Sequence, residues 1–492
     1  MCGIAGFITI VRKDADVLRA NALTLADALL HRGPDDGDVW IDSELSVALA
    51  HRRLAILDLS PAGHQPMHSA CGRYVAVYNG EIYNCRELRS ELDAVGLAPA
   101  WRGHSDTEVL LAGIVAWGVE ETLLRARGML ALAVWDRQQK TLILARDRIG
   151  EKPLYYGRVG DAFVFSSELK ALRNFPDARF DLDPEALSLM LRYGYVPAPK
   201  SIYKGIFKLM PGTLLHVAVD GSFGDPNLWW SFSNAAQVGA KHRQARSDGH
   251  SIDSLEAVLS AAIGEQMVAD VPLGALLSGG LDSSMVVALM QKSSTRPVRT
   301  FTIGFAEGDY NEAIHAKAVA RHLGTEHTEL HVDPAQALAI IPRLPDIYDE
   351  PFADSSQIPT TLLCALTQQH VTVCLSGDAG DELFGGYNRY LWANSLWSRF
   401  GHVPPWLRQA TAVGLSAVPA GIWNGAYRSL SSLLPKRLSV SNPGDKLHKF
   451  AEVIGALSQE ALYRELISQW RGQLPLRTTG EPSTLVADPT LW

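Results

Sequence analysis

The stretch Pro272-Leu-Gly-Ala-Leu-Leu-Ser-Gly-Gly-Leu-Asp-Ser-Ser284 decides the fold of the second half of the chain. Its first six residues are apolar or turn-forming and fit a buried strand, and the two glycines that follow indicate a tight turn before a helix. Such a turn presents unpaired backbone N–H groups and the positive end of a helix dipole, which together bind phosphate. An ordinary strand-to-helix turn with Ser and Asp capping the helix is the alternative. The chain contains no GxxxxGK[ST] motif, which disfavours P-loop kinase chemistry.

The residues after this stretch repeat the same rhythm of strand and helix. Strand patterns and helical patterns follow each other at 299–305, 313–323, 326–332, after Asp333 and at 371–375. This alternation predicts a parallel, doubly wound α/β sheet, in which ligands bind at the carboxyl ends of the strands. Beyond Tyr387 the pattern is mostly helical, so we expect C-terminal helices after the sheet.

The first 170 or so residues mix short apolar strands with helices. Strand patterns occur at 2–10, 74–79, 128–136, 141–146 and 162–168, and helical spacing occurs at 15–30, 86–95 and 106–117. They predict an α+β domain with layered sheets. From about Gly224 to Ser254 the chain is polar and rich in Gly, Asn, Ser and Gln, which indicates a linker or exposed loop. We therefore expect one domain over 1–215, a linker or loop over 216–254, and a second domain over 255–492.

Composition limits the classes of protein to consider. A chain of 492 residues exceeds the size of a single hydrophobic core. Forty-five Lys and Arg against 53 Asp and Glu, without a basic tract, disfavour nucleic acid and anionic membranes as partners. No signal or transit peptide pattern is present, and five cysteines without disulfide or zinc spacing fit a reducing, cytoplasmic location. The uncharged stretch between Arg408 and Arg428 is interpreted as a buried helical pair and not as a membrane span.

Cys2 is the first candidate nucleophile. If Met1 is removed, the α-amine of Cys2 lies beside its own thiol. One residue then supplies both nucleophile and base, as in N-terminal nucleophile enzymes. A small apolar residue that opens a strand is the alternative reading of a lone cysteine.

Polar residues of suitable types follow along the chain. Attack on a carboxamide needs hydrogen-bond donors for the developing oxyanion, and the Asn79 amide and the Gly80 backbone N–H are donors of that kind. An amino-acid substrate needs a guanidinium for its carboxylate and acids for its ammonium, and Arg53, Glu81 and Asp106 are those types. Each of them taken alone also fits a solvated surface charge or a turn residue.

Six motifs resemble, in order, those of the class II glutamine amidotransferase domain. They are MCGIAGF at 1–7, HRGPD at 31–35, RLAILD at 53–58, YNGEIYN at 78–84, SDTE at 105–108 and RDRIGEKPLYY at 146–156. The resemblance implies an N-terminal-nucleophile fold, which is a four-layer αββα sandwich. It also implies that Cys2 is the glutaminase nucleophile and that Asn79 and Gly80 form the oxyanion hole. The implied glutamine pocket consists of Arg53, Leu54, Ala55, Ile56, Leu57, Asn79, Gly80, Glu81 and Asp106.

The motif SGGLDSS at 278–284 is similar to the PP-loop of ATP pyrophosphatases, which cleave ATP to AMP and pyrophosphate. A second Gly-rich turn, SGDAGDELFGGY at 376–387, carries three acids. Asp282 and Asp381 suit Mg²⁺ on the pyrophosphate, because a hard cation prefers carboxylate and phosphate oxygens. Helix capping is the alternative role for these acids.

The order of these two regions, together with EPFAD at 350–354, resembles glutamine-hydrolysing asparagine synthetase. The resemblance implies an ATP site formed by Leu276, Ser278, Gly279, Gly280, Asp282, Ser283, Ile303, Ser376 and Gly377. It further implies that Asp378 assists formation of β-aspartyl-AMP and that Glu382 contacts the substrate aspartate. Glucosamine-phosphate synthase and the purine-pathway phosphoribosyl transferase, which share the amidotransferase domain, lack a PP-loop.

The family reaction joins the two sites. Ammonia is released from glutamine at Cys2, travels along a dry passage, and displaces AMP from an adenylated carboxylate to give the amide. The implied partners are glutamine, aspartate and ATP with Mg²⁺, and a homodimer is usual in the family. Two alternatives stay open: the same chemistry on another carboxylate, such as a uronic acid or a peptide precursor, and a non-catalytic relative that binds glutamine or nucleotide.

The chain departs from the family pattern at its end. The family continues with helices that carry an aspartate-contacting arginine motif and a lysine that stabilises adenylate formation, and this chain reaches Trp492 with neither. The final stretch 478–492 reads as a connecting loop. We therefore expect intact glutaminase chemistry and weakened or absent synthetase chemistry.

Overall fold

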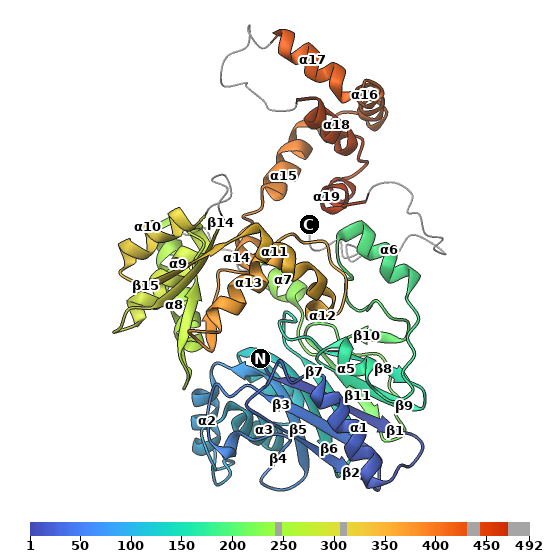
Figure 1. Ribbon diagram of the computed structural model, residues 1–492, viewed down its shortest axis with the longest axis vertical. Helices are drawn as coiled ribbons and strands as arrows, with labels where there is room; N and C mark the ends of the chain where they lie inside the picture. The colour runs from blue at the N-terminus through green and yellow to red at the C-terminus, as the bar shows by residue number, and fades with distance from the viewer. Residues whose placement is uncertain (242–247, 306–311, 431–442, 471–492) are drawn as a thin grey trace. The chain divides into compact units, whose positions relative to one another are not determined.

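The computed structural model describes residues 1–241, 248–305, 312–430 and 443–470 (Figure 1). These residues form two compact units. The first unit comprises Met1–Leu187 and Val196–Gly377, and the second comprises Ser188–Tyr195 and the residues from Asp378 onward. The final stretch 478–492 and residues 242–247 of the expected linker lie outside the described residues.

Two antiparallel sheets form the N-terminal part of the first unit. The first sheet has the order β10 (Ile206–Lys208), β8 (Tyr155–Val159), β9 (Ala162–Ser166), β1 (Gly3–Thr9), β3 (Val47–Arg53) and β2 (Asp36–Asp42). The second has the order β12 (Asn227–Leu228), β11 (Thr213–Ala218), β7 (Thr141–Arg146), β6 (Gly128–Asp136), β5 (Tyr74–Ile82) and β4 (Met67–His68). The strands expected from the sequence are all present at their expected positions.

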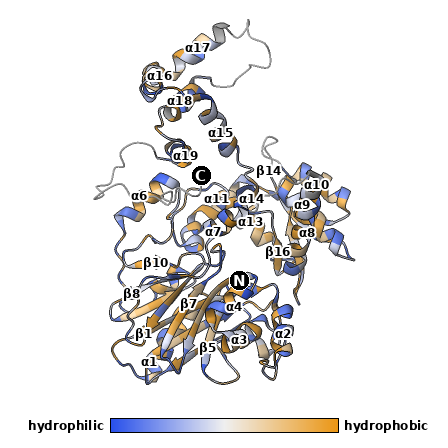
Figure 2. Cartoon of the chain, turned by 180° about the vertical axis from the view of Figure 1, so that it is seen from behind, coloured by the Kyte–Doolittle hydropathy of each residue, from blue (hydrophilic) through white to orange (hydrophobic). Residues whose placement is uncertain are grey.

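A continuous apolar layer joins the inner faces of these sheets. Ile4 and Leu49 of the first sheet pack there with Val77 and Trp135 of the second, and all four side chains are buried. The outer faces are covered by α1 (Ala15–Asp27) and α5 (Leu169–Arg173) on the first sheet, and by α2 (Cys85–Ala94), α3 (Asp106–Trp117) and α4 (Val119–Arg125) on the second. Figure 2 shows strands such as β1, β5 and β7 largely in the hydrophobic colour. The expected four-layer αββα sandwich is confirmed.

A four-stranded parallel sheet forms the rest of the first unit, in the order β15 (Glu326–Val332), β14 (Arg299–Phe305), β13 (Leu273–Leu276) and β16 (Val373–Leu375). The helices α8 (Asp248–Gln266), α9 (Leu281–Ser293) and α10 (Ala313–Leu323) share one buried cluster with β13. The helix α13 (Gln357–Thr367) packs against β14, and α11 (Pro334–Ile340) and α12 (Leu344–Tyr348) precede it in the chain. Strand order reverses at β13, so the carboxyl end of β13 is the expected ligand position.

The stretch expected as a linker or loop over 216–254 contains regular structure, so that expectation is wrong in part. It includes β12, the helix α7 (Phe232–Lys241) and the start of α8. None of the residues of α7 is buried. A polar composition therefore marked a solvent-exposed helix here and not an irregular loop.

The second unit is helical, as expected beyond Tyr387. Its elements are part of α6 (Pro184–Tyr193), α14 (Gly380–Phe384), α15 (Asn388–Phe400), α16 (Pro405–Ala417), α17 (Ala420–Leu430), α18 (Pro443–Ile454) and α19 (Gln459–Ile467). The predicted helical pair is present as α16 and α17, but its predicted burial is wrong, since Val413 is 70% and Ile422 60% exposed. Both helices pack on α18, which leaves their remaining faces uncovered among the described residues. No helix in the described ranges combines the length and apolar character needed to cross a membrane.

His51 of β3 connects the two sheets of the sandwich. Its ring is 1% exposed, and Nε2 lies 3.0 Å from the backbone oxygen of Tyr78 in β5. Burial, which opposes a charged ring, lowers the pKa of His51 to about 3. The neutral imidazole is therefore part of the folded core at neutral pH.

Acidification should destabilise this sandwich through His51. The unfolded His51 binds a proton near pH 6.5, whereas the folded residue binds one only near pH 3, so lowering the pH through this window favours the unfolded chain. The cost is at most about 1.4 kcal/mol for each pH unit. The melting temperature of the wild type should fall as the pH is lowered from 6.5 to 4, and it should fall less steeply in His51→Gln. His216→Gln, on the exposed side of β11, should keep the wild-type decline. An unchanged decline in His51→Gln would contradict this account.

Candidate functional site

A small cavity of about 50 Å³ lies where the start of β1 and the end of β3 face β5. Its lining includes Cys2 and all but one of the residues expected to form the glutamine pocket; the exception is Ala55. The expected residues that line the cavity are Arg53, Leu54, Ile56, Leu57, Asn79, Gly80, Glu81 and Asp106. The backbone N–H of Ala55 donates instead to Asp35 Oδ2 at 2.8 Å. Residues from four separate segments of the sequence thus surround one cavity.

Cys2 lies at this cavity together with the chain's α-amine. The Cys2 Sγ is 3.4 Å from the backbone nitrogen of Leu54 and 3.6 Å from its oxygen. Burial raises the pKa of the Cys2 thiol, and burial also lowers the pKa of the Met1 amine to about 6. At neutral pH the thiol therefore keeps its proton while the amine is mostly an uncharged base. The uncharged nitrogen of Met1 and the protonated thiol of Cys2 thus belong to residues that line the same cavity.

Asn79 and Gly80 present hydrogen-bond donors at the same cavity. Asn79 is 1% exposed, and its Nδ2 has no hydrogen-bond partner among the residues that the structure describes. Buried polar groups are nearly always paired, so an orphaned amide at a cavity wall indicates a ligand or water there. A Cβ on Gly80 would lie 2.0 Å from the backbone oxygen of Met129, so glycine allows the close pairing of β5 with β6.

The charged side chains of the cavity lining are those of Arg53, Glu81, Asp106 and Lys152. Asp106, at the start of α3, accepts hydrogen bonds from the Ile82 N–H at 2.9 Å and the Tyr78 hydroxyl at 3.1 Å. Burial, followed by the charge of Asp106, raises the pKa of Glu81 to about 7. Lys152 also lines the cavity, and burial lowers its pKa. Glu81 therefore changes its charge within the physiological pH range.

Several cavity residues were not predicted from the sequence. Lys152 belongs to the motif at 146–156, but no role was assigned to it. Gln65 lies in none of the quoted motifs, and its side chain accepts from the Tyr78 N–H at 2.7 Å and donates to Thr107 Oγ1 at 3.3 Å. No sequence signal could have identified Gln65, because only the tertiary fold brings it to the cavity.

Arg53 makes contacts beyond those expected. Its guanidinium donates to the backbone oxygens of Ser60 at 3.1 Å, of Leu57 at 3.4 Å, and of Asp58. These bonds hold the loop after β3 in a closed turn. The side chain is 6% exposed, so its charge is presented to the cavity from within the fold.

The predicted phosphate-binding turn follows β13 as expected. Gly279 has φ +81°, a conformation that side chains disfavour, and a Cβ there would lie 2.7 Å from the backbone nitrogen of Ala316. The Ser278 and Ser283 hydroxyls lie 2.9 Å apart, and the Gly280 N–H donates to Ser278 Oγ at 3.2 Å. The turn is thus a compact, glycine-dependent loop at the N-terminal end of α9.

The other predicted ATP residues lie at the end of β13 and on, or directly after, the two strands beside it. Leu276 ends β13, Ile303 lies in β14, and Ser376 and Gly377 directly follow β16. A Cβ on Gly377 would lie 2.6 Å from the backbone nitrogen of Ser283, so this turn packs closely against the phosphate-binding turn. All nine predicted ATP residues therefore belong to the first unit, at or near the carboxyl edge of its parallel sheet.

The predicted residues Asp378, Asp381 and Glu382 belong to the second unit. Within that unit the Tyr387 hydroxyl donates to Glu382 Oε1 at 2.7 Å. Within the described ranges no group of three or more His, Cys, Asp or Glu residues is arranged to hold a metal ion. The two predicted metal ligands, Asp282 and Asp381, belong to different units.

A larger cavity of about 890 Å³ lies within the first unit. Met1, Arg32 and Leu54 from the sandwich line one part of it, and Leu276 and Ser376 from the parallel sheet line another. The surroundings of Cys2 and the carboxyl edge of the parallel sheet therefore open into one shared space.

Comparisons with known proteins match two families to successive parts of the chain. The glutamine amidotransferase domain family matches residues 1–230, and the asparagine synthase family matches residues 254–487. The chain is 33% identical to a putative glutamine-hydrolysing asparagine synthetase 2 of Methanocaldococcus jannaschii, over 96% of this chain and 90% of that protein. It is 34% identical to glutamine-hydrolysing asparagine synthetase 1 of Bacillus subtilis, over 80% of this chain and 60% of that protein. An amidase, chry2, of Gibberella zeae is 29% identical over 79% of this chain and 60% of its own length.

Proposed function

Because the chain belongs to the glutamine-hydrolysing asparagine synthetase family, we propose that it forms asparagine from aspartate with ammonia drawn from glutamine. ATP, the co-substrate of the family, is cleaved to AMP and pyrophosphate, and glutamate is the second product. The observation that carries the proposal is one cavity lined by the Cys2 thiol, by an Asn79 amide that has no partner among the described residues, and by the charged side chains of Arg53, Glu81 and Asp106. The chain is an enzyme of the amidotransferase and ligase class.

The glutaminase step uses Cys2 after Met1 has been removed. The α-amine of Cys2 accepts the thiol proton, and Sγ attacks the carboxamide carbon of glutamine. Donors from Asn79 and Gly80 stabilise the oxyanion, the C–N bond breaks, and the amine returns the proton to the leaving ammonia. Water then cleaves the thioester to release glutamate. Met1 lines the cavity, so its removal both creates the Cys2 amine and enlarges the space for glutamine.

The charged residues of the cavity suit the two ends of an amino acid. The guanidinium of Arg53 complements the α-carboxylate of glutamine, and the carboxylates of Glu81 and Asp106 complement its α-ammonium. Burial strengthens these interactions, since the local dielectric constant is lower than that of water. Leu54, Ile56 and Leu57 supply the apolar part of the wall.

The synthetase step takes place at the turn after β13. The backbone N–H groups of this turn and the start of α9 bind the phosphates of ATP, and the aspartate carboxylate attacks the α-phosphorus with release of pyrophosphate. Asp378 assists this step, and Glu382 contacts the amino-acid substrate. Asp282 and Asp381 would hold Mg²⁺, whose charge when bound offsets that of the phosphates. The 890 Å³ cavity supports passage of ammonia from one site to the other.

A second candidate keeps the chemistry and changes the acceptor. Relatives that match most of this chain include two named amidases rather than asparagine synthetases, so we keep a carboxylate other than aspartate as a second candidate acceptor. The chain spans 60% of the length of the Bacillus relative and 90% of the Methanocaldococcus relative. A panel of carboxylates, each assayed for ATP-dependent pyrophosphate release, decides between the acceptors.

Cys2→Ala should abolish glutamine hydrolysis and leave ammonia-dependent synthesis at the level of the wild-type chain. The substitution removes the nucleophile, whereas free ammonia bypasses the first site. Glutamate and pyrophosphate release should be measured separately, with glutamine or an ammonium salt as nitrogen source and aspartate as acceptor. Glutamate release by Cys2→Ala, or loss of both activities in a folded variant, would contradict two separate sites. Cys85→Ala, at a buried cysteine outside the cavity, is the matched control.

Asn79→Ala should lower the glutaminase kcat by about 10²- to 10³-fold with little change in the glutamine KM. An oxyanion donor acts mainly on the transition state, so its loss slows the reaction more than it weakens substrate binding. Asn79→Asp, which keeps the size but not the donor, should be equally slow in steady-state assays. A normal kcat in Asn79→Asp would count against this role.

The glutamine KM should rise as the pH falls from about 8 to about 6. Glu81 gains a proton near pH 7 and then no longer attracts the α-ammonium of glutamine. Glu81→Gln mimics the protonated side chain, so its KM should be about 10- to 100-fold higher and nearly independent of pH. Steady-state kcat and KM across this range provide the measurement. Glu151→Gln, at a residue outside the cavity lining, should keep the wild-type profile; a wild-type profile in Glu81→Gln would refute the assignment.

A further inference from the structure

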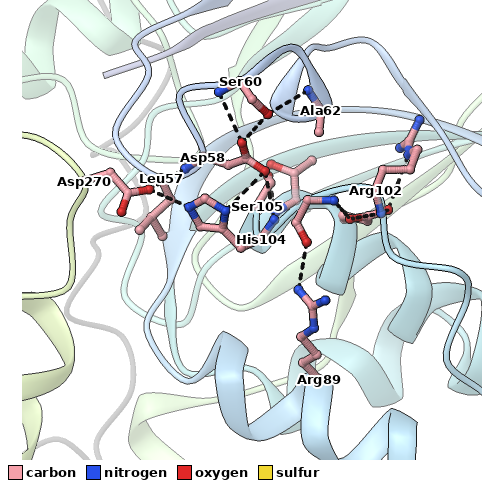
Figure 3. A network of polar contacts seen from close by, with 12 residues as sticks. Leu57, Asp58, Ser60, Ala62, Arg89, Arg102, His104, Ser105 and Asp270 are labelled. Carbon is pink, nitrogen blue, oxygen red and sulfur yellow. Dashed lines mark hydrogen bonds and ion pairs between the residues drawn. The ribbon is translucent and has the colours of Figure 1, made fainter.

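Asp270 connects the parallel sheet with the wall of the glutamine cavity. It lies on the short segment between α8 and β13, and its backbone N–H donates to the oxygen of Ile56 at 3.0 Å. Its Oδ2 accepts from the Asp58 N–H at 2.8 Å and lies 2.7 Å from Nε2 of His104 (Figure 3). One residue of the synthetase half thus contacts two different segments of the sandwich.

Asp58 is the centre of these contacts. It is 1% exposed and has φ +56°, a backbone conformation that residues other than glycine disfavour and that persists where neighbouring contacts hold it. Its carboxylate accepts from the Ser60 N–H at 3.1 Å and from the His104 N–H at 2.8 Å. A Cβ on Gly103 would lie 2.0 Å from Asp58 Oδ2, so the two segments are in close contact.

Each of the two segments carries part of the cavity wall. Ile56 and Leu57 directly precede Asp58, and Ser105 and Asp106 directly follow His104. A shift of Asp270 would release the Asp58 N–H and His104 together, and the strained Asp58 backbone could then relax. Both parts of the wall would move with it.

Strand β13 connects Asp270 to the phosphate-binding turn. Asp270 precedes β13, the strand that ends in this turn, and Ala275 within the strand is fully buried. A buried, paired strand moves as a rigid element, because its neighbours are closely packed. A change at the turn therefore reaches the segment that carries Asp270.

We propose that Asp270 is a positioning residue that couples ATP binding at the turn after β13 to the affinity of the cavity for glutamine. The proposal rests on the glutaminase function proposed above. Asp270 contacts neither substrate, and it acts through Asp58 and His104 on the walls that do. ATP bound at the turn favours the arrangement in which Asp270 holds both parts of the cavity wall through Asp58 and His104.

A second contact between the same two parts of the first unit provides a matched control. The Arg127 Nη2 lies 2.8 Å from Glu265 Oε1 and 2.7 Å from Glu87 Oε2, on an exposed surface. None of these three residues lines the glutamine cavity. Glu265→Gln therefore weakens the attachment of the two parts without releasing the cavity wall.

Steady-state kinetics with and without saturating ATP test the coupling. In the wild type and in Glu265→Gln, ATP should lower the glutamine KM. Asp270→Ala should raise that KM about 2- to 30-fold, with kcat and ammonia-dependent pyrophosphate release unchanged, and ATP should no longer affect it. Asp270→Asn keeps one acceptor oxygen and should give an intermediate KM.

Several outcomes would overturn the proposal. One is a wild-type glutamine KM that does not respond to ATP, and another is a response to ATP that persists in Asp270→Ala. A third is an Asp270→Ala variant that changes only in kcat, and a fourth is an equal rise in the glutamine KM in Glu265→Gln. If the wild type does not hydrolyse glutamine at all, the proposed function fails, and hydrogen exchange still tests the coupling. Added ATP should then slow amide exchange over residues 54–60 in the wild type and in Glu265→Gln but not in Asp270→Ala; equal protection in all three would refute it.

Discussion

The burial of the first strand is the constraint on which the glutaminase site depends. All seven residues of β1 are buried, and the strand is paired on one side with β3 and on the other with β9. Its register sets Gly3 opposite Arg52, so Cys2 is placed beside the end of β3 and cannot move independently of the sandwich. The N-terminus of most proteins is solvated and mobile, whereas here the core fixes it.

Loss of solvent has opposite effects on the two groups that share this position. It raises the pKa of the Cys2 thiol and lowers that of the Met1 amine, so at neutral pH the thiol keeps its proton while this amine is mostly uncharged. The same burial brings Glu81 into the range where it titrates near neutrality. One physical cause, desolvation, is therefore the largest contribution to the pKa shifts of all three groups.

The sequence allowed the layered sandwich, the parallel sheet and most of the cavity lining to be predicted, because strand periodicity and glycine-rich turns are local signals. The resemblance to the class II glutamine amidotransferase domain implied Cys2, Asn79 and the segment 53–57, and of these only Ala55 lies outside the cavity lining. Gln65 and Asp270 were not found, because their roles depend on contacts between distant segments. The exposed faces of α16 and α17 were misjudged for a related reason, since an uncharged composition does not reveal how many neighbours a helix has.

The position of Met1 also limits how the protein can be produced. Any residue or affinity tag left ahead of Cys2 would replace its amine by an amide nitrogen, which cannot accept a proton, and would occupy the space where Met1 lines the cavity. A preparation of this kind could fold normally and melt normally, yet be inert toward glutamine. Purification handles therefore belong at the opposite terminus, and intact-mass measurement of the first residue is a necessary check on any negative result.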